Sequence, residues 1–133
     1  MDWKLEVIVL PVSDVDRAKA FYTEQVGFAL DVDHRDGDFR VVQMTPPGSG
    51  CSITVGTGLS ASEPGSVKGL QLVVKDIDAG RAELVERGVD VSPVRHLDSG
   101  TWIDGHGGDW NSFMFFDDPD GNSWTVQQSP GRG

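Results

Sequence analysis

The chain has 133 residues, 38% of them hydrophobic, and a formal net charge of −10. This length suffices for one domain with its own core. The negative field repels phosphate backbones and no basic run offsets it, which argues against nucleic acid as a partner. No apolar run approaches the roughly 18 residues of a membrane span, and the first residues lack the basic segment of a secretory signal. One cysteine, Cys51, excludes an internal disulfide and indicates a reducing compartment, so we predict a cytoplasmic protein with no membrane partner.

The first half predicts one strand, one helix and three more strands. Residues 5–10 are typical of a strand that is apolar on both faces. Ser13 and Asp14 offer helix N-cap chemistry, and apolar residues at helical spacing continue to about residue 26, where Gly27 ends the helix. The three further strands are expected at residues 28–33, 39–44 and 51–55.

The second half follows a linker and repeats the pattern. Residues 56–66 are rich in Gly, Ser and Ala. Residues 70–75 predict a strand, and Asp76 and Asp78 open a helix that Gly88 ends. The remaining elements are expected to be a short strand at about 89–94 broken by Pro93, a long loop over 97–111, and two strands at 113–116 and 123–127.

The last two strands are joined by Asp117-Asp118-Pro119-Asp120-Gly121-Asn122. Pro119 presets φ and Gly121 can adopt positive φ, so this stretch predicts a tight hairpin turn, and turn formation also explains its aspartates. The strand at 113–116 is apolar on both faces and is expected to be buried on both. In the return strand, Trp124 and Val126 should enter a core. The alternate residues form a polar face that needs a ligand or water; they are Ser123, Thr125 and Gln127.

The chain contains an internal repeat. Residues 12–16, Val-Ser-Asp-Val-Asp, match residues 74–78, Val-Lys-Asp-Ile-Asp, at an offset of about 62 residues. Neither half has enough strand to close a sheet alone. We therefore predict an α+β fold in which two βαβββ modules form a curved mixed sheet with a central cleft and helices on the outer face. The expected organisation is one domain over 1–133, with module 1 at about 4–57, a linker at 58–67 and module 2 at about 68–128.

These segments resemble the vicinal oxygen chelate superfamily, which includes glyoxalase I, bleomycin resistance proteins and extradiol dioxygenases. The resemblance covers about residues 5–127 and is carried by Val12 to Ala18 with Phe21-Tyr22 and Gly27-Phe28, by Val74 to Asp78, and by Asp118 to Asn122. It implies paired βαβββ modules, a homodimer, and a cleft that in many members holds a divalent metal ion.

The metal ligands implied by the resemblance are missing. Val7 stands where metal-binding relatives carry His or Gln, Gly69 and Gln71 where they carry His, and Thr125 where they carry Glu. A divalent ion of this type prefers three or four carboxylate or imidazole donors. We therefore predict no metal and no cofactor; a divalent metal with substitute ligands is the alternative.

The loop over 97–111 carries Trp102 and Trp110 among glycines, which predicts either an aromatic lid over a flat or cationic ligand or simple packing on the sheet edge. His34 is expected at the surface, whereas His96 has no clear assignment. Two candidates for acid–base catalysis are His106 and Asp109. The predicted ligand-binding residues are Val7, Val9, Gln71, Val73, Trp102, Trp110, Ser123, Thr125 and Gln127.

The predicted site is apolar and lacks the expected metal ligands, which leaves two functions. The first is a metal-free protein that binds a small organic molecule in the cleft between the modules, as bleomycin resistance proteins do. The alternative is a lyase or isomerase on the same glyoxalase-like fold, either metal-independent or with non-standard metal ligands.

Overall fold

The structure is a computed structural model that describes residues 1–130. The chain forms two compact units, each with its own sheet. The first unit comprises residues 1–67 together with the turn at 118–122, and the second comprises residues 68–117 and 123–130. Among the described residues, no helix is long and apolar enough to cross a membrane.

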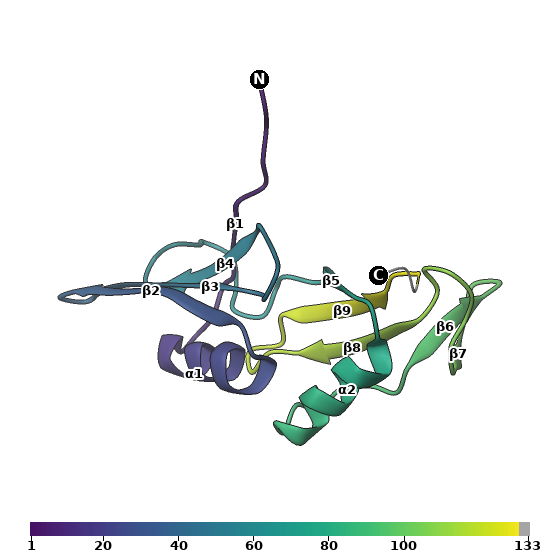
Figure 1. The fold of residues 1–133 in the computed structure, drawn as a ribbon. Coiled ribbons are helices and arrows are strands. Elements are labelled where there is room, and N and C mark those ends of the chain that lie inside the picture. Colours follow the sequence, from purple (N-terminus) through teal and green to yellow (C-terminus); the bar gives the residue numbers. More distant parts are fainter. Residues whose placement is uncertain (131–133) are drawn as a thin grey trace. The chain divides into compact units, whose positions relative to one another are not determined.

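The first unit contains one helix and a four-stranded sheet (Figure 1). The strands lie in the order β1-β4-β3-β2, in which β1 is parallel to β4 and the other pairs are antiparallel. The elements are β1 (Val7–Val9), α1 (Val15–Ala20), the π-helical turn η1 (Phe21–Val26), β2 (Ala29–Asp36), β3 (Phe39–Thr45) and β4 (Ser52–Gly56).

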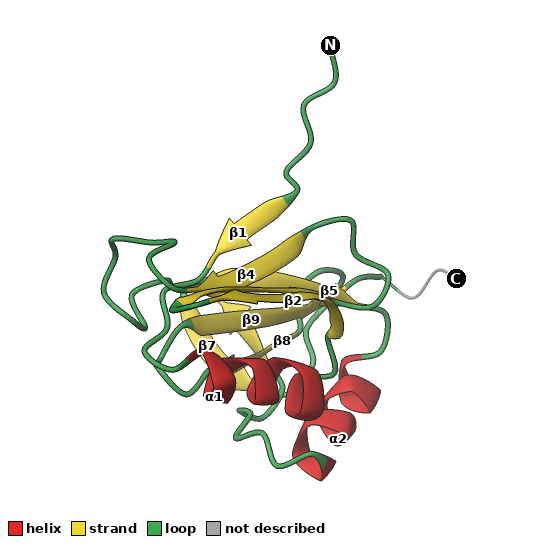
Figure 2. Cartoon of the chain, turned by 90° about the vertical axis from the view of Figure 1, so that its left-hand side faces the viewer, coloured by secondary structure: helices red, strands yellow, loops and turns green. Residues whose placement is uncertain are grey.

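The second unit contains one helix and a five-stranded sheet in the order β5-β9-β8-β6-β7. Figure 2 draws its helix in red and its strands in yellow. Here β5 is parallel to β9 and the other pairs are antiparallel. The α+β class is thus confirmed, with one more strand in the second unit than expected. The elements are β5 (Leu70–Val74), α2 (Ile77–Glu86), β6 (Arg95–Asp98), β7 (Thr101–Asp104), β8 (Phe113–Asp117) and β9 (Ser123–Gln128).

The internal repeat is visible in how the two helices begin and end. Asp14 and Asp76 are the N-caps, and each carboxylate accepts a hydrogen bond from the backbone N–H three residues on, at 3.1 and 3.0 Å. Gly27 follows the first helix with φ of 94°, and Gly88 follows the second with φ of 84°. The same cap chemistry therefore defines both helices.

Two predictions for this part of the chain are wrong, namely a strand at residues 89–94 and a loop that begins at residue 97. Residues 89–94 form no strand, because Pro93 lacks the N–H that a ladder needs. Instead β6 and β7 form a hairpin whose two-residue turn, Ser99-Gly100, has φ of 50° and 83°. This is the positive-φ geometry of hairpin turns. Trp102 consequently lies in strand β7 and not in a loop.

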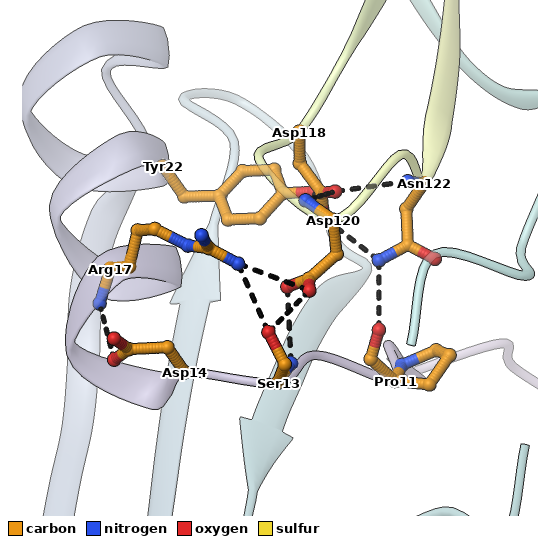
Figure 3. Close-up of polar contacts among 8 residues, drawn as sticks. All are labelled: Pro11, Ser13, Asp14, Arg17, Tyr22, Asp118, Asp120 and Asn122. Atoms are coloured by element: carbon orange, nitrogen blue, oxygen red, sulfur yellow. Dashed lines mark hydrogen bonds and ion pairs between the residues drawn. The ribbon is translucent and has the colours of Figure 1, made fainter. Parts of the chain in front are cut away.

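The turn at 118–122 is centred on the buried carboxylate of Asp118, which is 5% exposed (Figure 3). Two donors come from Asn122, whose backbone N and Nδ2 lie 2.9 and 2.8 Å away, and one from the N–H of Asp120 at 3.0 Å. The Tyr22 hydroxyl of η1 donates the fourth, at 2.8 Å. The expected hairpin turn between β8 and β9 is confirmed, and the buried Asp118 carboxylate stabilises it by accepting hydrogen bonds from two of its backbone N–H groups.

Two further residues, Asp120 and Asn122, attach the turn to the segment that leads into α1. The Asp120 carboxylate accepts from the Ser13 N–H at 3.1 Å, from its hydroxyl at 2.6 Å, and from Arg17 Nη2 at 3.1 Å (Figure 3). Asn122 is fully buried, and its Nδ2 also donates to the Pro11 carbonyl at 3.0 Å. Side chains of the turn therefore hold the segment between β1 and α1 in place through hydrogen bonds.

A second polar cluster joins α1 to β2 and β3. Arg40 is 9% exposed and donates to both carboxylate oxygens of Asp33, at 3.1 and 3.0 Å, and to Asp16. Lys19 also reaches Asp33, at 2.7 Å. Hydrogen bonds from Arg40 and then from Lys19 lower the pKa of Asp33 far below its usual range, while Asp33 and then Asp16 raise the pKa of Arg40.

We expect Tyr22→Phe to lower the free energy of unfolding by about 1.5–3 kcal/mol, because it removes one donor from a buried carboxylate. The measurement is urea unfolding at neutral pH. Thr23→Val is the control, since it removes only the local bond from the Thr23 hydroxyl to the Lys19 carbonyl, and it should change stability by less than about 1 kcal/mol. Equal losses in both variants would contradict the special role of the Asp118 carboxylate.

Stability should fall in acid through Asp33. Because its folded-state pKa is depressed, its contribution is complete above the unfolded pKa of about 4 and is lost as the pH falls below that value. Asp33→Asn should be less stable than the wild type at pH 7, and the difference should shrink between pH 4 and pH 2. Urea unfolding across this range measures it. Asp36→Asn, at the exposed end of β2, is the control, and its free energy of unfolding should fall in acid as that of the wild type does.

Candidate functional site

The second sheet has one covered face and one open face. The covered face carries Met114, Trp124 and Val126, which are at most 4% exposed and belong to the same core as Ile77 of α2. Strand register places the alternate residues together on the other side, which we call the open face. Its residues on β5, β9 and β8 are Gln71, Val73, Ser123, Thr125, Gln127, Phe113, Phe115 and Asp117.

An aromatic cluster lies on the open face. Trp102 of β7 contacts Phe113 and Phe115 edge-on, with ring centroids 5.4 and 5.2 Å apart and interplanar angles of 84° and 83°. Each edge-on contact contributes about 0.5–1.5 kcal/mol beyond burial of the rings. Even so, Trp102 remains 47% exposed. The cluster is therefore a fixed aromatic surface that still offers much of an indole to a ligand.

Phe113 and Phe115 were missed as candidates, because an apolar run predicts burial on both faces. In the structure each is only partly buried, while Met114 and Phe116 fill the core. Their pairing with Gln127 and Thr125 puts them on the polar side of β9. The available signal was the alternation in β9 itself, since residues paired across an antiparallel ladder share a face.

Side-chain amides line the open face beside this cluster. Gln71 Nε2 donates to Gln127 Oε1 at 2.6 Å, and Gln127 Nε2 donates to the carbonyl of Trp110 at 2.8 Å. Trp110 has φ of 62°, which is rare for a bulky side chain, and its side chain is 51% exposed. The Gln71–Gln127 pair thus connects the sheet to a strained residue of the loop after β7.

The same loop is also tied to β6. The Asn111 side chain accepts from the N–H of Leu97 and donates to its carbonyl, both at 2.9 Å. The Gly107 N–H donates to the Asn111 carbonyl at 3.0 Å. Of the two tryptophans expected on a lid, only Trp110 lies in this loop, and these bonds hold the segment after β7 in a defined position.

His106 and His96 of the second unit lie apart from the open-face cluster. His106 Nε2 lies 3.0 and 2.8 Å from the two carboxylate oxygens of Asp78 in the first turn of α2. His96 Nδ1 lies 2.9 Å from the Gly105 carbonyl, and the alternation of β6 turns its side chain away from the face that carries Trp102. His34 is exposed on β2, as expected, and Asp109 is exposed in the loop.

The residues present do not fit the divalent metal that the resemblance implies. At the expected ligand positions, Val7 offers no donor, and Gln71 and Thr125 offer an amide and a hydroxyl. Within residues 1–130, no three His, Cys, Asp or Glu side chains are grouped so that they could hold a metal ion. The donor chemistry of this site therefore suits hydrogen bonding to an organic molecule.

The remaining ligand-binding candidates, Val7 and Val9, lie on the first sheet, where they are 41% and 39% exposed. The second sheet groups the candidates Gln71, Val73, Ser123, Thr125 and Gln127 on one face with Trp102. A cleft that both modules share remains a prediction.

A family model described as the Glyoxalase/Bleomycin resistance protein/Dioxygenase superfamily matches residues 4–126. The search of curated proteins finds no match. Among solved structures, TnmS3, an antibiotic binding protein from Streptomyces sp. CB03234, is 33% identical over 96% of this chain and 97% of its own, with a TM-score of 0.77. A glyoxalase/bleomycin resistance protein from the same organism is 34% identical over 94% of this chain and 100% of its own, with a TM-score of 0.74. A superfamily member from Sphaerobacter thermophilus DSM 20745 is 26% identical over 96% and 98%, with a TM-score of 0.74.

We expect Gln127→Leu to loosen the loop after β7 without unfolding the sheet. The variant removes the hydrogen bond that holds the strained Trp110 carbonyl, so amide hydrogen exchange of residues 107–110 should accelerate about tenfold. Exchange measured by mass spectrometry tests this. Thr125→Val on the same face is the control and should leave the loop unchanged. Equal exchange in Gln127→Leu and wild type would show that Gln127 does not hold the loop.

Proposed function

Because the chain belongs to the glyoxalase/bleomycin resistance protein/dioxygenase superfamily, we propose that it binds and sequesters a small organic molecule on the open face of its second sheet, without a metal ion. The antibiotic-binding relative TnmS3 supports this class of function. The donor chemistry described above supports the metal-free form of the proposal.

The half-exposed indole of Trp102 carries the proposal. Its edge contacts with Phe113 and Phe115 fix the ring at little further entropic cost when a ligand arrives. Because an exposed tryptophan on a rigid sheet provides a large apolar contact area, it suits a flat ring system. We therefore propose that the bound molecule places an aromatic or conjugated portion against Trp102.

Polar groups on the same face would orient such a molecule. Thr125 and the amides of Gln71 and Gln127 can donate to or accept from its heteroatoms. Asp117 is also exposed there, and the whole chain carries a net charge of −10. An anionic surface with an exposed indole favours a ligand whose conjugated portion is uncharged or cationic.

Two further ligand-binding residues, the oligomeric state and the cellular location also belong to the proposal. The proposal keeps Val7 and Val9 of the first sheet as predicted ligand-binding residues, and a homodimer as the functional form. A cytoplasmic location, predicted from the single Cys51, belongs to the same proposal.

The alternative is a lyase or isomerase that uses the same face. The observation in its favour is the close pair of His106 and Asp78, since a carboxylate that orients an imidazole is common in general acid–base sites. His106 contacts helix α2, however, and the open-face cluster lies on the other side of the sheet. Sequestration is therefore the better-supported function.

We expect tryptophan fluorescence to be quenched by metal-free bleomycin, or by thioflavin T as a flat cationic probe, and Trp102→Ala to weaken binding about tenfold. The loss follows from removing the half-exposed indole that the proposal places against the ligand. Isothermal titration calorimetry measures affinity in parallel, because the variant also removes one fluorophore.

Trp3→Phe is the matched control, because Trp3 is 88% exposed on the first unit and should not affect affinity. The bound compound should be recovered with its mass unchanged. A product of altered mass or structure would contradict sequestration and favour the enzyme. If neither probe nor a wider panel of planar compounds binds with an affinity that depends on Trp102, the open face is not the site.

A further inference from the structure

Aspartate followed directly by glycine occurs three times in the chain, as Asp36-Gly37, Asp104-Gly105 and Asp120-Gly121. In such a pair the glycine amide nitrogen can attack the carboxyl carbon of the aspartate side chain, because glycine has no Cβ to hinder the approach. The attack needs a carboxyl group and an amide nitrogen that other hydrogen bonds do not hold, on a backbone that can move. The surroundings of each pair therefore decide which one reacts.

The fold holds both reacting groups of Asp120-Gly121. The Asp120 side chain is only 8% exposed and accepts hydrogen bonds from Ser13 and Arg17. The Gly121 N–H donates to the Asp118 carbonyl at 2.9 Å. Bringing the carboxyl group onto the glycine nitrogen would break these bonds together, so the structure protects this pair.

The Asp104-Gly105 pair is held mainly at its amide. The Gly105 N–H donates to the Val94 carbonyl at 2.8 Å, and the Gly105 carbonyl lies 2.9 Å from His96 Nδ1. The Asp104 carboxylate is exposed, but it accepts a hydrogen bond from Arg95 Nε at 3.1 Å. The attacking nitrogen must therefore leave its acceptor before this pair can react.

Neither reacting group is held in the Asp36-Gly37 pair. It stands at the tip of the β2–β3 hairpin, where Asp36 pairs with Phe39 and Gly37 takes φ of 60° in the two-residue turn between them. Figure 1 shows this end of the hairpin projecting beyond the rest of the first unit. Within residues 1–130, the Asp36 carboxylate and the Gly37 N–H have no hydrogen-bond partner. No atom beyond the neighbouring residues lies within 4 Å of the position that a Cβ on Gly37 would occupy.

We propose that Asp36 is a site of spontaneous covalent modification, at which aspartate is converted into isoaspartate. In the first step the Gly37 nitrogen forms a bond to the side-chain carboxyl carbon of Asp36, and the carboxyl hydroxyl leaves with the amide proton as one water molecule. The product is a five-membered succinimide. In the second step one water molecule adds to this ring. Attack on the side-chain carbonyl restores aspartate, and attack on the main-chain carbonyl leaves the backbone running through the side chain. Water is the only co-reactant.

The modification alters the hairpin, because isoaspartate adds one methylene group to the backbone. Asp36 and Phe39 form the pair that closes the turn, and a longer backbone at residue 36 no longer matches the spacing of β3 opposite. The former main-chain carbonyl becomes a carboxylate side group, so the net charge stays the same. Amide hydrogen exchange at the hairpin tip should therefore be faster in the modified protein. This inference does not rest on the proposed ligand-binding function.

Peptide mapping of the aged, full chain tests the site. The folded protein is kept in warm, mildly acidic buffer and digested after lysine, which leaves Asp36 inside the peptide 20–68. Electron-transfer fragmentation then distinguishes isoaspartate from aspartate at each position. Isoaspartate should accumulate at residue 36 about tenfold faster than at residue 104 or 120, because each of those pairs must first break the hydrogen bond of its glycine N–H.

Two controls separate the fold from the local sequence. In a chain unfolded by guanidinium, the three pairs should react at similar rates, because the hydrogen bonds that distinguish them are lost. The variant Asp36→Glu keeps the charge but would have to close a less favourable six-membered ring. It should lose the product at residue 36 and leave slow conversion at the other two pairs unchanged.

Three results would overturn the inference. The first is equal conversion at Asp36 and Asp104 in the folded chain. The second is conversion of Asp36 in the unfolded chain alone, which would show that the hairpin holds the pair as firmly as the other two are held. The third is a ratio between the three sites that stays the same on unfolding, since the local sequence and not the fold would then select Asp36.

Discussion

The buried carboxylate of Asp118 sets the strongest constraint on the first unit. A buried charge is tolerated only when hydrogen-bond donors surround it. Here the turn supplies the N–H groups of Asp120 and Asn122, and the helical segment supplies the Tyr22 hydroxyl from 96 residues away in the sequence. The turn must therefore close with these amides pointing inward, which the φ of 99° at Gly121 permits. Once it has closed, Asp120 and Asn122 hold the residues that lead into α1.

The candidate site results from the same strand geometry that builds the second core. β9 alternates strictly, so burial of Trp124 and Val126 under helix α2 forces Thr125 and Gln127 onto the opposite face. Neighbouring strands in register extend this face, and the aromatic residues Phe113, Phe115 and Trp102 on it stay at least partly exposed. A partly apolar face with a few fixed amides is chemically suited to an organic ligand. Its lack of carboxylate and imidazole groups is equally a consequence of which residues occupy the alternate positions.

In residues 89–111 the structure differs from the elements that the sequence patterns predicted. Pro93 interrupts a run that otherwise has strand composition, while Asp98-Ser99-Gly100-Thr101 makes a hairpin without the Asn-Gly or Asp-Gly pair that usually signals one. Ser99 takes positive φ because the ladder on both sides fixes it there. Trp102 thereby becomes part of a rigid strand, which changes its role from a mobile cover to a fixed surface.

The sequence by itself determined the α+β class, the repeated strand–helix start with its aspartate caps, the hairpin at Asp118 to Asn122 and the polar face of β9. All of these depend on local periodicity or on turn and cap chemistry within a few residues. Only the tertiary structure decided that Phe113 and Phe115 face outward with Trp102, that Gln127 reaches Trp110, and that His106 is held by Asp78. These features depend on strand register and on contacts between distant residues, and local sequence preferences carry no information about which distant residues will meet.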